Sequence, residues 1–419
     1  MRLLGARLSA LALLASTAVS AEPLSLEAVI QHALQSNPGI AVAAADQDLA
    51  NAQVRQARAA ALPQVSLVGQ AAHGTADLGG FFGFGRQNID PRSAALELRQ
   101  PLFAGGAVLA GIDQAKLGRT AAEASALSMQ LQVAARAAEV YGAVLTARAR
   151  TQQTARYVAA TSEIARSAAL RFEAGEIPRS DWAQAEAREA EGQAQAAQAA
   201  AQLASAQGQF RAIVGIEPDE LLPLPAVAAA EPDITLLLAR AEQNNPDLAA
   251  AQAVAKAAHS GVQMAQAERL PSLALTARAS TVRDEFLPGY ASQGSIIGIQ
   301  GKWTVFASGG TNARIDVARA AARRADAQLA QLQDQLRSAV LTTWATLRSS
   351  EAAVRAASAQ LTASDQALNS LQHEVRAGQR TTLELLNAER DRLAAATSLA
   401  VARSALTTTA WQLAALTGR

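Results

Sequence analysis

The 419-residue chain contains no cysteine, and aromatic residues make up only 4% of it. The lack of cysteine excludes a disulfide scaffold and also a lipid-modified cysteine at a mature N-terminus. So few aromatic residues are unusual for a large globular core, whereas small side chains suit long helices that pack closely. The formal net charge is only +1, so neither nucleic acid nor another polyanion is expected as a partner.

Long apolar runs are also missing after the N-terminus. The first residues have the pattern of a signal peptide over 1–21: Arg2 and Arg7, an apolar stretch from Leu8 to Ala18, and the small residues Val19-Ser20-Ala21. The alternative is a transmembrane anchor, but the apolar stretch is shorter than the roughly 20 residues that a span needs. We therefore expect an exported chain starting at Glu22, whose only route through a membrane is by β-strands.

The second half of the chain repeats the first. Asn37-Pro38 and Leu62-Pro63 return 208 residues later as Asn245-Pro246 and Leu270-Pro271. Further on, the offset is 203 residues, as in Phe103-Ala104 and Phe306-Ala307. This period is far longer than that of solenoid repeats, about 20–50 residues. It predicts a duplicated unit: repeat 1 over 22–215, a proline-rich linker over 216–233, and repeat 2 over 234–419.

Each repeat is expected to begin with two helices. Ser25 and Thr235 are candidate N-caps of the first helix, and Asn37-Pro38 and Asn245-Pro246 supply an N-cap and a proline that start the second. The second helices are expected to run to Leu62 and Leu270, where a proline follows.

The hydrophobic period then changes to two, which predicts β-hairpins over about 63–103 and 271–306. Apolar residues alternate with polar ones, as in Leu96-Glu97-Leu98-Arg99, and aromatic residues stand at the ends (Phe103, Trp303, Phe306). A Gly- and aromatic-rich loop containing Phe81, Phe82 and Phe84 joins the first pair of strands. This alternation is typical of strands that face lipid on one side and water on the other; the alternative is an ordinary soluble hairpin.

Long helices without proline follow, over about 107–172 and 311–375. Apolar residues recur every three or four positions, which predicts coiled-coil seams: Leu127, Leu131, Ala134, Ala138, Tyr141 and Leu145 in the first, and Leu329, Leu332, Leu336, Val340, Thr343 and Leu347 in the second. Helices of this length reach on the order of 100 Å, too far for one compact domain. Turns over about 174–181 and 377–384 lead into return helices.

Four strands cannot close a barrel, and an open sheet edge in lipid leaves backbone groups unpaired. Copies of the chain must therefore share one barrel. Two copies give eight strands, whose interior side chains fill, and three give twelve, with room for a channel. Packing the long helices side by side in a ring also buries their apolar seams.

Signs of catalysis or metal binding are absent from the sequence. The four histidines are scattered without metal-ligand spacing. There is no G-x-S-x-G nucleophile motif and no phosphate-binding loop. We expect a protein that is not an enzyme and has no cofactor or metal.

At three places the chain resembles the outer-membrane efflux protein family of the TolC type. These are LSLEAVIQHALQSNP (24–38), RQPLFAGG (99–106) with its copy VFASGG, and RAGQRTTLELLNAER (376–390); LAALTG (413–418) also fits. The resemblance implies a mostly α fold with a membrane β-barrel segment: a two-repeat protomer of a homotrimer, with a 12-stranded β-barrel in the outer membrane and a long α-helical barrel in the periplasm. It also implies a passive duct that contacts outer-membrane lipid and docks with a periplasmic adaptor and an inner-membrane pump of RND, ABC or MFS type.

The resemblance further implies that the two helix turns form the periplasmic tip, where the channel narrows and the adaptor docks. The expected gate residues are Asp181, Arg380 and Glu384. The expected docking turns contain Ala174, Gly175, Glu176 and Ile177 in repeat 1, and Ala377, Gly378, Gln379 and Thr381 in repeat 2. Val375 and Asn387 depart from the family's Tyr and Asp, which predicts a weaker latch. Without the resemblance, these charges would be interpreted as a solvated turn.

Two functional readings follow from the sequence. The first is the exit duct of a tripartite efflux or type I secretion system, and the second is a periplasmic coiled-coil structural or adaptor protein without a pore. The repeated hairpins, with apolar and charged faces, favour the duct. The sequence shows no substrate pocket, so it does not reveal whether the duct exports drugs, metal ions or proteins.

Overall fold

The computed structural model describes residues 23–77, 85–227 and 233–418. The predicted signal peptide and the loop residues Phe81, Phe82 and Phe84 lie outside this part of the chain. Within the described part, no helix is both long enough and apolar enough to cross a membrane.

The chain forms two compact units, and each takes segments from both sequence halves. One contains the N-terminal residues through Ala33, Ala137–Ala226 and Val354–Thr407; the other contains Leu34–Arg136, Val227–Ala353 and Thr408–Arg419. Compact packing therefore does not follow the repeat boundary near residues 216–233, because elements of one repeat pack against those of the other.

The second unit contains the sheet and the helices that lead into it. Helices α2 (Pro38–Ala59) and α6 (Pro246–Ala267) precede the strands of each repeat, and α5 (Ile234–Asn244) precedes α6. Asn37 and Asn245 cap α2 and α6 through their side-chain oxygens, with proline in the first turn, so these two predicted starts are confirmed. Both helices end three residues before the predicted Leu62 and Leu270.

The predicted caps of the opening helices have different outcomes. Helix α1 (Leu26–Ser36) is capped by Ser25, whose hydroxyl accepts a hydrogen bond from the Ala28 N–H at 3.2 Å. The prediction of Thr235 as the cap of α5 is wrong. Asp233 is the cap, because its carboxylate accepts from the Thr235 N–H at 2.8 Å.

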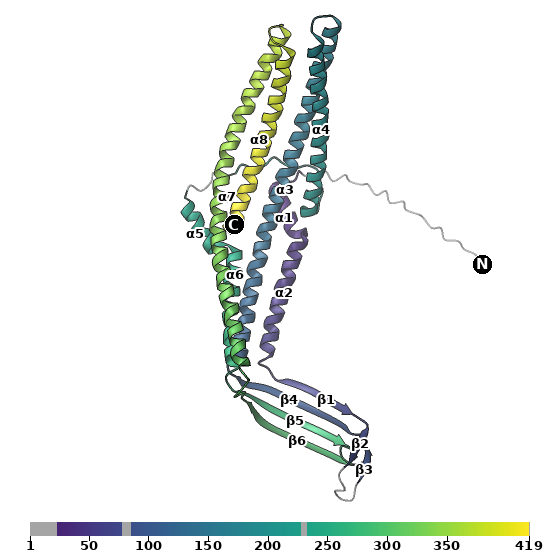
Figure 1. Cartoon of the computed structure of the whole chain (residues 1–419), viewed down its shortest axis with the longest axis vertical. Helices are drawn as coiled ribbons and strands as arrows, with labels where there is room; N and C mark the ends of the chain where they lie inside the picture. Colours follow the sequence, from purple (N-terminus) through teal and green to yellow (C-terminus); the bar gives the residue numbers. More distant parts are fainter. Residues whose placement is uncertain (1–22, 78–84, 228–232, 419) are drawn as a thin grey trace, which may run out of the picture. The chain divides into compact units, whose positions relative to one another are not determined.

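The sheet has the order β1-β4-β5-β6 with antiparallel neighbours, as Figure 1 shows. Its strands are β1 (Gln64–Ala71), β4 (Arg92–Ala104), β5 (Ser272–Arg283) and β6 (Ala291–Lys302). A separate hairpin of β2 (Gly74–Asp77) and β3 (Arg86–Ile89) lies between β1 and β4 in sequence. Strand β6 ends at Lys302, four residues before the predicted end at Phe306.

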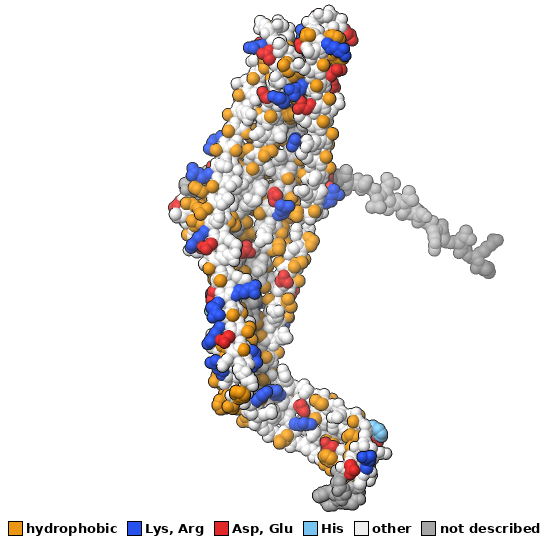
Figure 2. Space-filling view, viewed as in Figure 1, with side chains coloured by type: hydrophobic (Ala, Val, Ile, Leu, Met, Phe, Trp, Pro, Cys, Tyr) orange, Lys and Arg blue, Asp and Glu red, His pale blue; other side chains and the backbone are white. Residues whose placement is uncertain are grey.

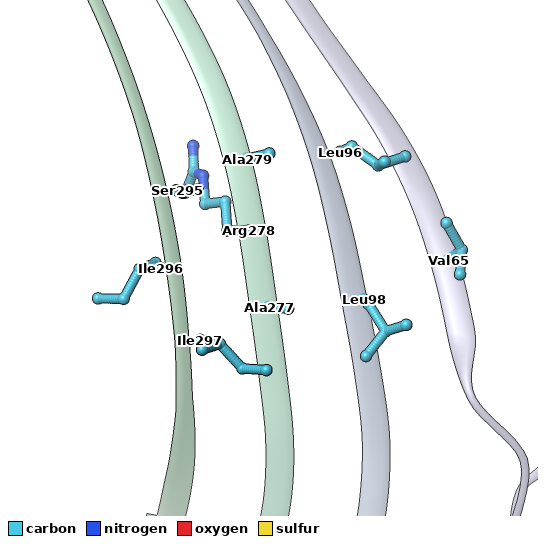
Figure 3. A pocket seen from close by; sticks show the side chains of 9 residues that line it. All are labelled: Val65, Leu96, Leu98, Ala277, Arg278, Ala279, Ser295, Ile296 and Ile297. Atoms are coloured by element: carbon cyan, nitrogen blue, oxygen red, sulfur yellow. The ribbon is translucent and has the colours of Figure 1, made fainter.

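Apolar and polar rows alternate across this sheet, as period two requires. Val65, Leu98, Ala277 and Ile297 are paired in one row across all four strands. In the next row Glu97 pairs with Arg278, at 3.5 Å between their charged groups. A hollow of about 440 Å³ lies along these rows. The side chains that line it, shown in Figure 3, are Val65, Leu96, Leu98, Ala277, Arg278, Ala279, Ser295, Ile296 and Ile297. The small Ala277 and Ala279 leave this hollow between larger apolar neighbours.

Three side-chain contacts join α5, α6 and the residue that follows α6 to α7 (Gly310–Arg376) within the second unit; two are ion pairs and one is a hydrogen bond between a histidine and an aspartate. They are Glu242 with Arg337 at 2.8 Å, His259 with Asp326 at 3.1 Å, and Glu268 with Arg314 at 2.6 Å. Along these three contacts, the residue numbers increase on the α5–α6 side and decrease on α7. The helices therefore run antiparallel in one register. Basic side chains gather along this stretch of α7 in Figure 2.

The first unit contains the turn ends of two helical hairpins, which lie side by side in Figure 1. One joins α3 (Ala107–Glu173) to α4 (Arg179–Val214), and the other joins α7 to α8 (Thr382–Leu416). Small residues allow close helix packing here: a Cβ added at Gly192 of α4 would lie 3.3 Å from the ring of Tyr157 on α3.

Half of the predicted seam residues in the two long helices are buried, and the others except Leu127 are partly buried. In α3, Ala134, Ala138 and Tyr141 are buried, but Leu127 is 48% exposed and does not belong to the buried seam of the single chain. In α7, Leu336, Val340 and Leu347 are buried.

The linker contacts the N-terminal segment in the first unit. Leu24 and Leu221 form a parallel bridge, with the Leu24 N–H donating to the Glu220 carbonyl at 2.8 Å. The buried Tyr141 hydroxyl lies 3.0 Å from the Leu24 carbonyl and 2.6 Å from that of Leu222. One side chain of α3 therefore fixes both segments.

Candidate functional site

The two helix turns of the first unit have the same backbone geometry. Gly175 and Gly378 have φ of 77° and 73°, the left-handed conformation that favours glycine after a helix. The Glu176 N–H donates to the Arg171 carbonyl at 2.9 Å, and the Gln379 N–H donates to the Glu374 carbonyl at 2.9 Å. The turns therefore differ in side-chain chemistry alone.

Arg380 in the second turn makes ion pairs within its own turn. Its guanidinium lies 3.0 Å from Glu374, at the end of α7, and 3.0 Å from Glu384, in the first turn of α8. The hydrogen bond to Glu374 is the main reason why the pKa of Arg380 is raised, and the hydrogen bond to Glu384 is the next largest cause. The arginine thus ties the end of one helix to the start of the next.

Glu384 and Thr381 form a capping box at the start of α8. The Thr381 N–H donates to the Glu384 carboxylate at 2.9 Å, and the Glu384 N–H donates to the Thr381 hydroxyl at 3.3 Å. The hydrogen bonds from Thr381 are the main reason why the pKa of Glu384 is lowered, and Arg380 adds to the effect.

Asp181 in the first turn corresponds to Glu384 by the 203-residue offset but has different partners. Thr381 is replaced at the corresponding position by Pro178, which provides no side-chain cap for α4. The Asp181 carboxylate accepts a hydrogen bond from the Ser180 hydroxyl at 3.3 Å. A negative charge in the first turn of α4 also interacts favourably with the helix dipole. No capping box therefore engages the Asp181 carboxylate.

Glu176 in the first turn pairs with Arg171 at 3.2 Å. Of the predicted gate residues, the structure brings Arg380 and Glu384 together. Both ion pairs recorded for Arg380 are with its own turn, and none joins it to Asp181 within the described residues of one chain.

Beneath the turns lies a small apolar core that the sequence reading did not identify. Ile177 of the first turn and Trp182 of α4 pack against a buried cluster of Ala165, Ala168, Ala185 and Leu386. The Trp182 ring stacks on Phe172 with centroids 5.2 Å apart. Leu386 comes from α8, so this cluster joins the two hairpins just below the turns. The sequence signal for this core was the pair Phe172 and Trp182, two aromatic residues that flank a turn in a chain with only 4% aromatics.

Further from the turns, polar side chains connect three helices. Arg392 of α8 lies 2.6 Å from Asp365 of α7 and 3.3 Å from the Gln153 side chain of α3. Burial is the main reason why the pKa of Glu389 on α8 is raised, although Arg392 and the hydrogen bond from Gln372 oppose this. Sequence spacing alone could not identify this group of polar side chains, because its members come from distant parts of the chain.

Among the described residues, no group of three or more histidine, aspartate and glutamate side chains is placed to hold a metal ion. The site is therefore a pair of charged turns over an apolar core, and its side chains bind one another.

The family model described as "Outer membrane efflux protein" matches residues 29–216 and 237–419. The chain belongs to this family. The two matched segments correspond to the two halves of the duplication, and the predicted outer-membrane localisation follows from this membership.

A curated relative of this chain is the outer membrane efflux protein BepC of Brucella suis. The two are 28% identical over 264 residues, which cover 62% of this chain and 58% of BepC. The match thus spans less than two thirds of that relative.

Solved structures resemble this chain over most of its length. The outer membrane protein VceC of Vibrio cholerae superposes with a TM-score of 0.81 at 21% identity, over 94% of this chain and 96% of that one. The CmeC outer membrane channel of Campylobacter jejuni gives 0.83 at 16% identity, over 94% and 85%. These similarities confirm the predicted fold class.

Proposed function

We propose that this efflux protein is the exit duct of a tripartite efflux or type I secretion system. In this proposal it is a passive conduit through the outer membrane and carries out no chemistry. The main support for this proposal is the family match over both halves, in a chain that combines helices of 67 residues with a four-stranded sheet. The alternative of an adaptor without a pore is not favoured, because the family model covers the strands as well as the helices.

The working form in this proposal is a homotrimer. One chain provides four sheet strands, and β1 and β6 are the two edges of that sheet. Three chains supply twelve strands, the number with room for a channel inside a closed barrel. Closure pairs the edge strands, which would otherwise be unpaired in lipid. Exposed apolar side chains such as Leu67 and Ile297 then face outer-membrane lipid.

The partners in this proposal are a periplasmic adaptor and an inner-membrane pump, with docking at the two turns. The docking residues are Ala174, Gly175, Glu176 and Ile177 in the first turn, and Ala377, Gly378, Gln379 and Thr381 in the second. Support comes from the apolar core beneath the turns, which gives them a rigid base. The type of pump and the cargo follow from the partner, since selectivity is assigned to the pump.

The gate in this proposal consists of Asp181, Arg380 and Glu384. Arg380 and Glu384 stiffen the second turn through their ion pair and the capping box. Asp181 has no capping-box partner in its own turn, so its carboxylate is the one available to a cation of a neighbouring hairpin in the ring.

The duct can be tested with protein purified from outer membranes in detergent. We expect a heat-sensitive trimer on gels, and discrete current steps when it is added to planar bilayers in KCl. Boiled protein serves as the control and should give no steps. A chain that fractionates as a soluble periplasmic monomer and passes no current would contradict the duct.

A further inference from the structure

The two faces of the four-stranded sheet differ in where they are charged. We call the face that contains Val65, Leu98 and the residues at every second position from them the apolar face. On the opposite face, the four described strands have the charged residues Glu97, Arg99, Arg278 and Lys302. On the apolar face of the same strands, the charged residues are Arg92 of β4 and Arg283 of β5. All the charge of the apolar face is therefore positive and lies in one place.

Arg92 and Arg283 are directly opposite each other across the β4–β5 ladder. Their neighbours in the same row are Ala71 on β1 and Ala291 on β6, and all four residues are exposed. This row is at the end of the sheet beside β2 and β3, as Figure 1 shows. Two guanidinium groups thus stand side by side, with small neighbours that leave space around them.

Two carboxylates near this row are engaged elsewhere. Asp284, directly after Arg283, accepts a hydrogen bond from the Gly289 N–H at 2.6 Å. Asp90, two residues before the other arginine, lies 2.7 Å from the His73 ring. Within the described residues, neither arginine has an ion-pair partner. Like charges directly opposite each other on neighbouring strands destabilise a sheet, so an anion from outside the chain would relieve this row.

The row lies at the depth of lipid headgroups. This step rests on the proposed function, which turns the apolar face toward outer-membrane lipid. A membrane-spanning strand has about 9–11 residues, and aromatic residues mark its interfaces with water. Counting about ten residues back along β4 from the exposed Phe103 reaches Ala94. Arg92 lies two residues further, just outside the hydrocarbon, at the end of the strand that faces the cell exterior in this proposal.

The apolar face changes in character from this row inward. The next row consists of small or neutral residues, Gly69, Ala94, Thr281 and Gln293. After it come the row of Leu67 and Leu96 and then the row of Val65 and Leu98. This order of charge, neutral polar groups and hydrocarbon matches the order of phosphate, sugar and acyl chain in a phosphorylated glycolipid.

A hollow on the same face begins four residues inward of the arginines, at Leu96 and Ala279. Four residues of strand correspond to about 13 Å. The hollow has a volume of about 440 Å³ and is lined mainly by apolar side chains, as Figure 3 shows. An acyl chain whose headgroup is at the arginine row has the right depth to lie in this hollow.

We propose that Arg92 and Arg283 bind a phosphate group of a glycolipid in the outer leaflet of the outer membrane. A phosphate monoester carries about −1.5 to −2 charges at pH 7, which balances the two guanidinium groups. Arginine suits this ligand because its planar fork donates two parallel hydrogen bonds to phosphate oxygens. Both residues come from the inner strands of the sheet, so each chain contains a complete site.

The geometry favours a lipid over free inorganic phosphate. The row is exposed, so a small anion bound there keeps most of its contact with water. A lipid phosphate is held at this depth by its acyl chains, which gives it a high effective concentration at the arginines. The hollow on the apolar face adds contacts that a free anion lacks.

The binding test uses the full-length wild-type trimer, purified in detergent and stripped of lipid. The probe is lipid A, an acylated glucosamine disaccharide with two phosphates, and native mass spectrometry measures how much of it the trimer binds. We expect the variant with Arg92→Gln and Arg283→Gln to bind lipid A at least fivefold more weakly than the wild type. Lipid A without its phosphates should bind the wild type as weakly as the intact lipid binds this double variant.

Melting temperatures separate lipid binding from a structural role of the arginines. Without lipid A, the double variant should melt at the same temperature as the wild type or higher, because the repulsion across the row is removed. With lipid A, the wild type should gain more stability than the double variant. A double variant that is less stable without lipid would show that the arginines stabilise the chain itself and would overturn the proposal.

Two further variants serve as controls. The variant with Arg99→Gln and Lys302→Gln removes two positive charges from the opposite face of the same sheet and should bind lipid A like the wild type. The variant with Arg92→Lys and Arg283→Lys keeps the charge without the planar fork, so its affinity should lie between those of the wild type and the glutamine variant.

The outcomes separate the lipid site from the duct. If lipid A without phosphates binds as tightly as the intact lipid, or the opposite-face control loses as much binding, the phosphate site is wrong and the duct stands. If inorganic phosphate at the same concentration stabilises the wild type as much as lipid A does, the row binds free anions and the lipid assignment is wrong. If the wild-type chain is a monomer that passes no current, the proposed function fails, and the outward orientation of the apolar face fails with it.

Discussion

Thr381 and Glu384 bond to each other's backbone across the first turn of α8, with distances of 2.9 Å and 3.3 Å. The same carboxylate group takes part in the ion pair with Arg380. The start of α8 is thus held by a closed local network of side chains from the turn itself. The first turn has Pro178 where Thr381 stands.

The capping box should depend on pH. The pKa of Glu384 is lowered in the folded chain, so the bound carboxylate contributes stability above the ordinary value of 4.5, and that contribution is lost as pH falls through the lower folded value. We expect the amide protection of Thr381 and Glu384, corrected for intrinsic exchange, to stay constant above pH 4.5 and to fall below it. Glu384→Gln keeps an acceptor without the charge, so its protection should be flat over this range. A wild-type profile equally flat down to pH 3 would contradict the box.

Arg380→Ala should raise single-channel conductance in planar bilayers, because it removes both ion pairs that hold the second turn. Asp181→Ala should also raise it if Asp181 binds a cation across the ring. The matched control is Arg319→Ala. This arginine lies on α7, away from the turns, has a side chain 49% exposed compared with 52% for Arg380, and pairs with Asp316. If conductance is unchanged in both Arg380→Ala and Asp181→Ala, these turns do not form the gate.

The substitutions Tyr141→Phe and Tyr157→Phe should change the free energy of unfolding by different amounts or in opposite directions. The Tyr141 hydroxyl bonds to the linker and N-terminal carbonyls, so its loss should cost about 1–2 kcal/mol. Tyr157 is only 2% exposed, and its hydroxyl has no hydrogen-bond partner among the described residues. Its removal should be neutral or stabilising. Urea unfolding of the detergent-solubilised protein compares the two, and equal losses would show that the Tyr157 hydroxyl has a partner.

Glu389→Gln should have the opposite pH dependence to Glu384→Gln. Burial raises the folded pKa of Glu389, so its contribution to stability is full below the ordinary value of 4.5 and is lost as pH rises through the folded value. At pH 7 the glutamine variant should therefore be at least as stable as the wild type, with the gain disappearing near pH 4. Melting temperatures measured from pH 4 to 8 test this. A variant that is less stable at pH 7 would show that the contacts with Gln372 and Arg392 outweigh burial.

Local signals predicted the starts of several elements because the deciding contacts lie within a few residues. Asn37 and Asn245 cap helices as expected, since an amide oxygen reaches the backbone N–H groups that directly follow it. Thr235 failed for the same reason: Asp233 stands two residues earlier, and its carboxylate already accepts from the Thr235 N–H and hydroxyl. A stronger acceptor nearby determined where α5 begins.

The candidate site was only partly predictable. The resemblance pointed to Arg380 and Glu384, but the sequence did not show that they bind each other. Leu386 and Arg392 were missed, because their importance comes from α3, which lies more than 200 residues earlier in the chain.

The sequence by itself determined the duplication and the period of each segment, and the offsets of 208 and 203 residues relate the strand pairs of the two hairpins. Only the tertiary structure decided which halves pack together, that Arg380 binds its own turn, and that β6 ends at Lys302. The reason is the range of the interactions. Caps and periods depend on neighbouring residues, whereas burial and ion pairing depend on how separate hairpins approach.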